Sequence, residues 1–142
     1  MTQKTVLLVD DEQGFLEALA DALEHAGHRV LKAVTAESAL QILQKERVQL
    51  VTVDIMLSPG ASLENVTSSR DAGIWLCEKI TAQYPSIDVF CLSVVNDQKI
   101  IRKIESFGVR FLRKGETPLR KILSMINSRL TGIAFSTEWL RD

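Results

Sequence analysis

The chain has 142 residues, of which 46% are hydrophobic and 25% are charged. This composition is average for globular proteins and excludes a chain that is disordered over most of its length. A chain of this length can bury enough apolar surface to fold without disulfides or a structural metal, and its two cysteines, Cys77 and Cys91, lack the spacing of metal ligands.

The net charge of −1 is unevenly distributed along the chain. Up to Val94 there are seven Lys and Arg against thirteen Asp and Glu, and from Val95 onward there are ten against five. This asymmetry indicates either an acidic site followed by a basic partner surface or ordinary solvated helix faces. No apolar stretch approaches the roughly 20 residues that span a bilayer, and no secretory signal precedes the first apolar run. We therefore expect a cytoplasmic protein with no membrane contact.

Apolar runs typical of strands alternate with apolar side chains at helical spacing in the first half of the chain. The run 6–9 precedes a helix that turns Phe15, Leu16, Leu19 and Leu23 inward and ends at Gly27. The run 28–33 alternates in polarity like a half-exposed edge strand, and Thr35 is expected to cap the helix that follows.

The second half of the chain begins with an almost continuously apolar run, 48–53, which is typical of a central strand. Periodicity is then lost from about residue 58 to 70. The remaining predicted elements are a helix at 71–84, a strand at 87–92, a helix at 97–107, a strand at 109–112 and a last helix to residue 130. In this last helix Thr117 is the expected N-cap and Pro118 the expected first helical residue.

Five strands alternating with five helices predict one α/β domain over residues 1–130, with a parallel sheet covered on both faces. Residues 131–142 add Phe135, Trp139 and Leu140 beyond it. This extension could begin a linker helix, cap the last helix or support a homodimer, and the sequence does not decide among them.

Polar side chains follow four of the predicted strands. They are Asp10, Asp11 and Glu12 after the first, Asp54 after the third, Ser93 after the fourth and Lys114 after the fifth. In an open parallel sheet, ligands bind beyond the carboxyl ends of the strands, so we expect these groups to converge.

Such a set of groups has the chemistry of a phosphoryl-transfer site. Clustered carboxylates repel one another unless a cation lies between them, and hard oxygen ligands suit Mg²⁺. An ammonium and a hydroxyl opposite the metal would stabilise charge on a phosphoryl group, with a carboxylate as nucleophile. Taken singly, each residue has an ordinary reading as a cap, a turn residue or a solvated lysine; their joint position at one edge favours the site.

Four segments together resemble the motifs of bacterial response-regulator receiver domains of two-component signalling. They are VLLVDDE at 6–12, VDIML at 53–57, LS at 92–93 and GVRFLRK at 108–114. The resemblance covers about residues 4–130. It implies a flavodoxin-like (βα)₅ three-layer sandwich with a five-stranded sheet in the order 2-1-3-4-5.

The resemblance also implies roles for matching residues. Asp54 would accept a phosphoryl group from the phosphohistidine of a sensor histidine kinase or a histidine phosphotransfer protein. Asp11, Asp54 and the backbone carbonyl of Met56 would bind Mg²⁺, with Asp10 acting through water. The chain would be a signalling domain that catalyses only its own phosphotransfer and dephosphorylation.

A switch is implied as well. Lys114 would pair with a phosphoryl oxygen, Ser93 would move to hydrogen-bond it, and Phe111 would rotate into the vacated space, although Phe111 also reads as a plain core aromatic. These movements would reshape the surface of the fourth helix, fifth strand and fifth helix, whose basic residues suit an acidic protein effector. Direct nucleic-acid binding is not expected, because no recognition motif accompanies the charge.

The sequence departs from the family pattern at three places. Pro59 comes one residue late and the matching glycine is Gly73, so about ten residues are inserted near 58–70, either as a neutral decoration or as a lid or partner-specificity element. Lys114 is followed by Gly115 instead of proline, so the peptide should be trans. Val94 and Met56 are apolar beside the site, and we expect them to hinder attacking water and prolong the phosphorylated state.

Two other functions compete with this interpretation. A phosphorylation-independent interaction module on the same fold usually lacks one of the acidic or lysine positions, all of which are present here. A phosphatase with an aspartyl-phosphate intermediate needs a second acid two residues after the nucleophile, where this chain has Met56.

Overall fold

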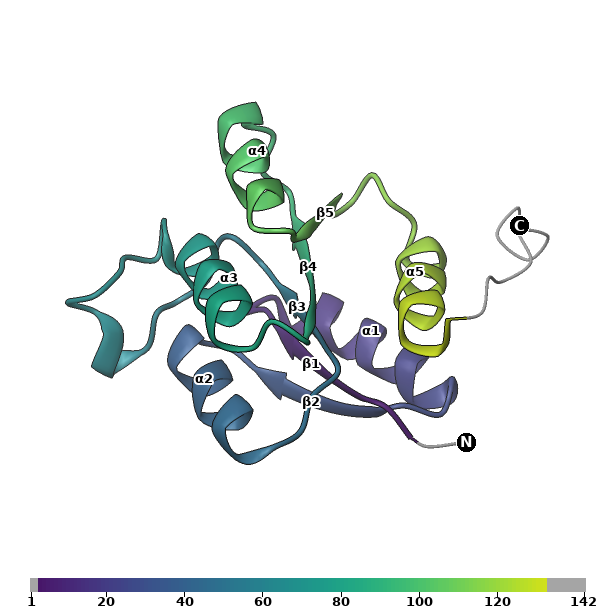
Figure 1. The fold of residues 1–142 in the computed structure, drawn as a ribbon. Coiled ribbons are helices and arrows are strands. Elements are labelled where there is room, and N and C mark those ends of the chain that lie inside the picture. The colour runs from purple at the N-terminus through teal and green to yellow at the C-terminus, as the bar shows by residue number, and fades with distance from the viewer. Residues whose placement is uncertain (1–2, 133–142) are drawn as a thin grey trace.

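The computed structural model describes residues 3–132, which form a five-stranded parallel sheet flanked by helices (Figure 1). The strands are β1 (Thr5–Val9), β2 (Arg29–Ala33), β3 (Leu50–Val53), β4 (Asp88–Ser93) and β5 (Arg110–Arg113). They are hydrogen-bonded in the order β2-β1-β3-β4-β5, and every pair is parallel. The predicted flavodoxin-like α/β fold and strand order are confirmed, with strand bounds within two residues of those expected.

Helices cover both faces of the sheet, so the domain has three layers, with the sheet in the middle. They are α1 (Gln13–His25), α2 (Ala36–Lys45), α3 (Ala72–Gln83), α4 (Gln98–Ser106) and α5 (Leu119–Thr131), with a short 3₁₀ turn η1 (Ala61–Leu63). One apolar cluster joins the sheet to α1 and α5, and a second joins it to α2, α3 and α4. Among residues 3–132, no helix is long and apolar enough to cross a membrane.

The alternation of side chains along β1 explains why the core is divided in two. Leu7 and Val9 belong to the cluster beneath α2–α4, whereas Val6 and Leu8 belong to the cluster beneath α1 and α5. β3, in the centre of the sheet, is buried at all four positions, and β2 at the edge is mostly not. The predicted central and edge strands are therefore confirmed.

Two predicted helix caps have different outcomes. The hydroxyl of Thr35 accepts a hydrogen bond from the backbone N–H of Ser38 at 3.0 Å, so the predicted cap of α2 is confirmed. The predicted cap at Thr117 is wrong, because α5 begins at Leu119 and Pro118 occupies the cap position with an extended ψ of 144°. The N–H of Thr117 instead donates to the carbonyl of Arg113 at 3.0 Å, which makes Thr117 part of the turn after β5.

The inserted segment 58–70 is attached to the domain at both ends. The carbonyls of Ser58 and Pro59 accept hydrogen bonds from the first backbone N–H groups of α2, at 3.0 and 2.9 Å. At the other end, the carbonyl of Ser68 accepts from Asp71 and Ala72, where α3 begins. Between them the segment projects beside α2 and α3 (Figure 1), and Leu63 packs against the core. The sequence did not predict these attachments.

Residues 133–142, most of the predicted extension, lie outside the described residues.

Candidate functional site

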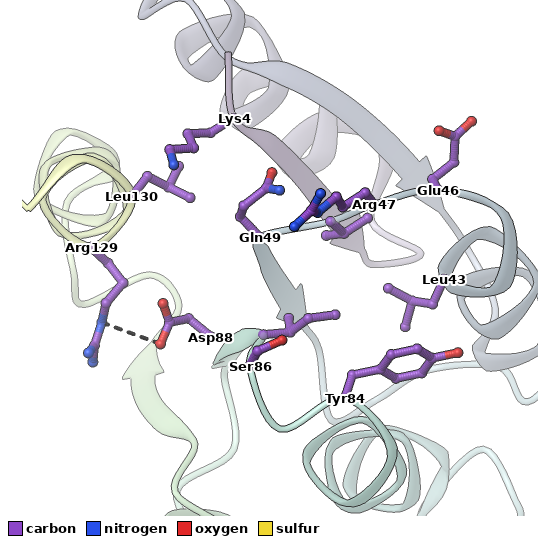
Figure 2. Close-up of a pocket in the computed structure, with 12 residues that line it drawn as sticks. Lys4, Leu43, Glu46, Arg47, Gln49, Tyr84, Ser86, Asp88, Arg129 and Leu130 are labelled. Carbon is purple, nitrogen blue, oxygen red and sulfur yellow. Dashed lines mark ion pairs between the residues drawn. The ribbon is translucent and has the colours of Figure 1, made fainter. Parts of the chain in front are cut away.

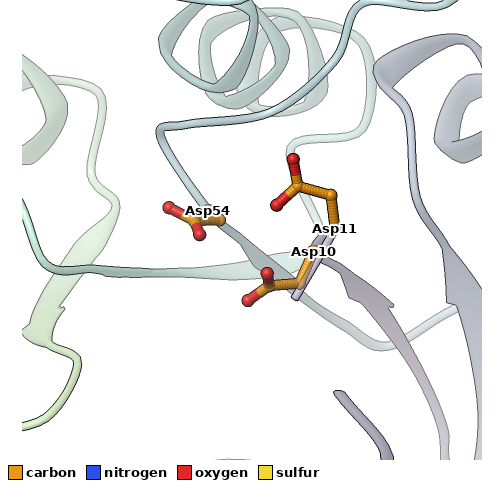
Figure 3. A group of neighbouring side chains, drawn as sticks. All are labelled: Asp10, Asp11 and Asp54. Atoms are coloured by element: carbon orange, nitrogen blue, oxygen red, sulfur yellow. The ribbon is translucent and has the colours of Figure 1, made fainter. Parts of the chain in front are cut away.

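Three aspartates meet at the carboxyl edge of the sheet. β1 and β3 are neighbours, and the pairing of Val9 with Val53 places Asp10 beside Asp54. One carboxylate oxygen from each of Asp10, Asp11 and Asp54 lies within 4.8 Å of the others, and Figure 3 shows the three side chains projecting from the ends of these strands. Asp10 and Asp54 are buried, whereas Asp11 is exposed. The topology thus makes a site from segments that are far apart in the sequence.

Lys114 supplies the positive charge of this cluster. Its Nζ lies 2.7 Å from Asp10 Oδ2, 3.1 Å from Asp54 Oδ2 and 3.2 Å from Glu12 Oε1. The lysine side chain is only 6% exposed. Burial by itself would lower the pKa of Lys114, but the hydrogen bond to Asp10 and the negative charges of Asp54 and Asp10 outweigh it and raise that pKa. The lysine therefore remains an ammonium ion at neutral pH.

The pKa of Asp10 is raised above its usual range. Burial is the main reason that the pKa of Asp10 is raised, and the nearby charge of Asp54 raises it further. The hydrogen bonds that Asp10 receives from Lys114 and from the backbone N–H of Glu12 (2.9 Å) lower the pKa but do not compensate. Three carboxylates whose oxygens lie within 4.8 Å of one another fit a divalent cation such as Mg²⁺.

The contacts of Asp54 hold its two oxygens in different surroundings. The backbone N–H of Met56 donates to Oδ1 at 3.1 Å, and Lys114 contacts Oδ2. Its own N–H donates to the carbonyl of Val9 at 3.1 Å. The carboxylate is thus fixed by backbone on one side and by a cation on the other.

The remaining predicted site residues differ in burial. Ser93, at the end of β4, is fully buried; its hydroxyl accepts from the N–H of Val95 at 3.3 Å, and its carbonyl accepts from the N–H of Lys114 at 2.9 Å. Val94 and the side chain of Met56 are 66% and 51% exposed. Phe111 is partly buried in the core beneath α2–α4 and belongs to that core, not to the carboxylate cluster.

Two features of the site bear on the sequence-based expectations. The peptide after Lys114 is trans, as predicted, since no cis peptide occurs in residues 3–132. The ring of Phe15 lies over Lys114, with 4.5 Å between Nζ and the ring centroid. The sequence analysis did not predict this contact, because Phe15 is one of several apolar residues on a helix face. No local pattern relates it to a lysine near the other end of the chain.

A hollow of about 420 Å³ lies at the opposite edge of the sheet (Figure 2). Lys4 precedes β1, Gln49 precedes β3 and Asp88 begins β4, so these lining residues mark the amino ends of the strands. Asp88 is paired there with Arg129 at 3.9 Å. The hollow is therefore separate from the carboxylate cluster, none of whose residues lines it.

Residues 6–127 match the family model described as the response regulator receiver domain, and the chain belongs to this family. It is 33% identical over 111 residues to a cyclic di-GMP phosphodiesterase of Thermotoga maritima, covering 78% of this chain and 27% of that protein. It is 40% identical over 109 residues to the phosphate regulon transcriptional regulatory protein PhoB of Pseudomonas aeruginosa, covering 77% and 43%. The chain thus spans less than half the length of these curated relatives.

Among solved structures, the fold is similar to that of a CheY-like receiver domain protein from Methanospirillum hungatei JF-1. The TM-score is 0.78 at 22% identity, and the match covers 92% of this chain and 96% of that one. Family membership makes the chain a signalling domain of two-component systems. Receiver domains typically bind Mg²⁺ in an acidic pocket, and the aspartate cluster has the composition of such a pocket.

Proposed function

We propose that Asp54 accepts a phosphoryl group from the phosphohistidine of a sensor histidine kinase or a histidine phosphotransfer protein. The observation that supports this role is the position of Asp54 in a receiver domain, as a buried carboxylate between two other aspartates and an ammonium ion 3.1 Å away. Asp54 is held in place by the N–H of Met56, which donates to one oxygen.

In the proposed reaction, a carboxylate oxygen of Asp54 attacks the phosphorus of the phosphohistidine. The P–N bond breaks, its electron pair returns to the imidazole nitrogen, and a P–O bond forms to give an acyl phosphate. Lys114 would move from its carboxylate partners toward a phosphoryl oxygen and stabilise the negative charge there. Its raised pKa supports this role because the ammonium form persists throughout the neutral pH range.

Asp10, Asp11, Asp54 and the backbone carbonyl of Met56 are the groups that would hold Mg²⁺. When bound, the ion would offset negative charge on the carboxylates and on the phosphoryl oxygens. The position of the three aspartates supports this assignment, because one oxygen from each lies within 4.8 Å of the others.

Ser93 and Phe111 would couple the acyl phosphate to a protein surface. The hydroxyl of Ser93 accepts a hydrogen bond from the N–H of Val95 at 3.3 Å, and its own O–H can donate to a phosphoryl oxygen. Phe111 would then move into the space that Ser93 leaves. The readout surface would be that of α4, β5 and α5, where Arg102, Lys103, Arg110 and Lys121 are exposed and suit an acidic protein effector.

Intact mass after incubation with acetyl phosphate and Mg²⁺ tests the proposal. We expect the wild type to gain one phosphoryl group and Asp54→Asn to gain none, and chelation of Mg²⁺ to prevent the gain. Asp21→Asn, an exposed aspartate on α1, is the matched control and should behave as the wild type. If the wild type gains nothing from acetyl phosphate or from a phosphorylated histidine kinase, a phosphorylation-independent interaction module becomes the better interpretation.

A further inference from the structure

The first turn of α1 contacts the ammonium of Lys114 through an aromatic ring. Phe15 is the third residue of α1, and its ring centroid lies 4.5 Å from Lys114 Nζ. A cation at this distance is attracted by the negative face of the ring, more strongly where water is excluded. Lys114 meets this condition because its side chain is 6% exposed.

We propose that Phe15 is a positioning residue that holds Lys114 in place for phosphoryl transfer to Asp54. The inference depends on the proposed function of Asp54, and it adds a role for a residue that contacts Lys114 instead of Asp54. In this scheme Phe15 acts through its contact with Lys114.

Lys114 needs such support because of where its side chain starts and ends. Its backbone follows β5, which is an edge strand, whereas Asp54 and Asp10 follow β3 and β1. Neighbouring strands are about 4.8 Å apart, so the flexible lysine stem must reach across at least one intervening strand. The backbone after it turns at Gly115 with a φ of +89°, in the region that favours glycine. The fixed ring therefore limits the freedom of a long side chain on a tight turn.

An aromatic face suits this position better than a further polar group would. Asp10, Asp54 and Glu12 already contact the ammonium at 2.7, 3.1 and 3.2 Å. A fourth carboxylate would compete with the phosphoryl oxygen for Lys114, whereas a ring attracts the cation without accepting a conventional hydrogen bond. Phe15 is itself held by packing against the cluster that joins α1 and α5 to the sheet.

The opposing interpretation is that Phe15 only fills space on the inner face of α1. Phe15→Leu keeps the apolar bulk and removes the ring, and Phe15→Tyr keeps the ring. Phe107→Leu is the matched control, because Phe107 is also partly buried but packs against the core beneath α2–α4. Thermal unfolding of each variant establishes that it is folded before its rate is compared.

The test measures the initial rate of phosphoryl gain from acetyl phosphate and Mg²⁺ by intact mass. We expect Phe15→Leu to be slower by about fivefold, the effect of losing one partly desolvated cation–π contact, while Phe15→Tyr and Phe107→Leu stay within about twofold of the wild type. In NMR spectra, the ε-methylene protons of Lys114 should show an upfield ring-current shift in the wild type and Phe15→Tyr that is lost in Phe15→Leu.

A double-mutant cycle separates positioning from packing. If Phe15 acts through Lys114, Phe15→Leu should not slow the residual reaction of Lys114→Ala further, followed over longer incubations. Any of three results would overturn the inference. Phe15→Leu could react at the wild-type rate, Phe15→Tyr could lose as much rate as Phe15→Leu, or Phe15→Leu could slow Lys114→Ala by the same factor as it slows the wild type. Failure of the proposed function is distinct from these, since the wild type itself would then gain no phosphoryl group.

Discussion

Gly73, in the first turn of α3, lies directly against the backbone of Asp54. A Cβ at Gly73 would stand 2.2 Å from the carbonyl oxygen of Asp54 and 2.4 Å from the Cα of Ile55. No real Cβ comes so close to backbone atoms, so only glycine permits this packing. The helix that follows the inserted segment thus supports the backbone that presents the proposed acceptor.

Gly73→Ala should therefore destabilise the domain and displace Asp54. Because the obstructing atoms are backbone atoms, which cannot move aside as a side-chain end could, we expect the free energy of unfolding to fall by about 3 kcal/mol. Urea unfolding followed by circular dichroism measures this. Gly14→Ala in α1 is the control: its Cβ would meet nothing within 4 Å, and it should be neutral or stabilising by up to about 1 kcal/mol. Equal stability of the two variants would contradict the packing argument.

Replacing Asp10 with asparagine should stabilise the metal-free protein at neutral pH. Burial and the charge of Asp54 raise the pKa of Asp10 above its ordinary 3.8, so the folded state favours the protonated acid. Its ionisation therefore costs stability, and this cost appears as the pH rises from 3.8 through the raised pKa. Asp10→Asn should unfold at a higher temperature than the wild type in EDTA at pH 7, and the difference should shrink as the pH is lowered.

Mg²⁺ should reverse this order if the cluster binds it. The ion should raise the unfolding temperature of the wild type more than that of Asp10→Asn, since binding to the folded state alone stabilises it. Asp21→Asn, on the exposed side of α1, should follow the wild type under all conditions. A less stable Asp10→Asn in EDTA at pH 7 would show that Lys114 does compensate for the burial of Asp10.

The apolar side chains of Val94 and Met56 should slow loss of the phosphoryl group. Both are largely exposed beside the site, where they can limit the approach of water to the acyl phosphate. Val94→Ala and Met56→Asn should each lose the phosphoryl group faster, though by less than the roughly 100-fold that a positioned general base contributes. Intact mass of the purified phosphorylated protein over time provides the rate. Unchanged rates in both variants, with the exposed Val66→Ala as control, would rule this role out.

The exposed turn of the inserted segment, residues 64–67, should be dispensable for the chemistry at Asp54. Residues 64–67 are mostly exposed, and the attachments of the segment lie at Ser58, Pro59, Leu63 and Ser68. Replacement of 64–67 by Gly-Ser-Gly-Ser at unchanged length should alter stability by about 0.5 kcal/mol and leave the rate with acetyl phosphate unchanged. If only the transfer from a phosphorylated kinase becomes slower, the segment is a partner-specificity element and not a neutral decoration. If the reactions with the kinase and with acetyl phosphate both become slower, the prediction is wrong.

The periodicity of the sequence predicted the five strands, the five α-helices and their order along the chain, whereas the order of the strands in the sheet was implied by the family resemblance. Strand alternation and helical spacing are local properties, and the core that they imply is the one observed on either side of β1 and β3. The placement of Asp10 and Asp54 at one edge also followed from a general property of parallel sheets, since both directly follow strands. The cap at Thr117 was wrong because the turn after β5 uses its N–H, a contact that residue preferences do not reveal.

The tertiary structure alone determined which groups share Lys114 and how the inserted segment is held. Glu12 and Lys114 are 102 positions apart, and Phe15 reaches the same ammonium from α1. The carbonyls of Ser58 and Pro59 meet α2 only because the segment after β3 passes the amino end of that helix. A single sequence records which side chains are present and how they repeat along the chain. Distances between remote residues depend on how whole helices pack on the sheet, and that packing places the ring of Phe15 over the lysine and Gly73 against Asp54.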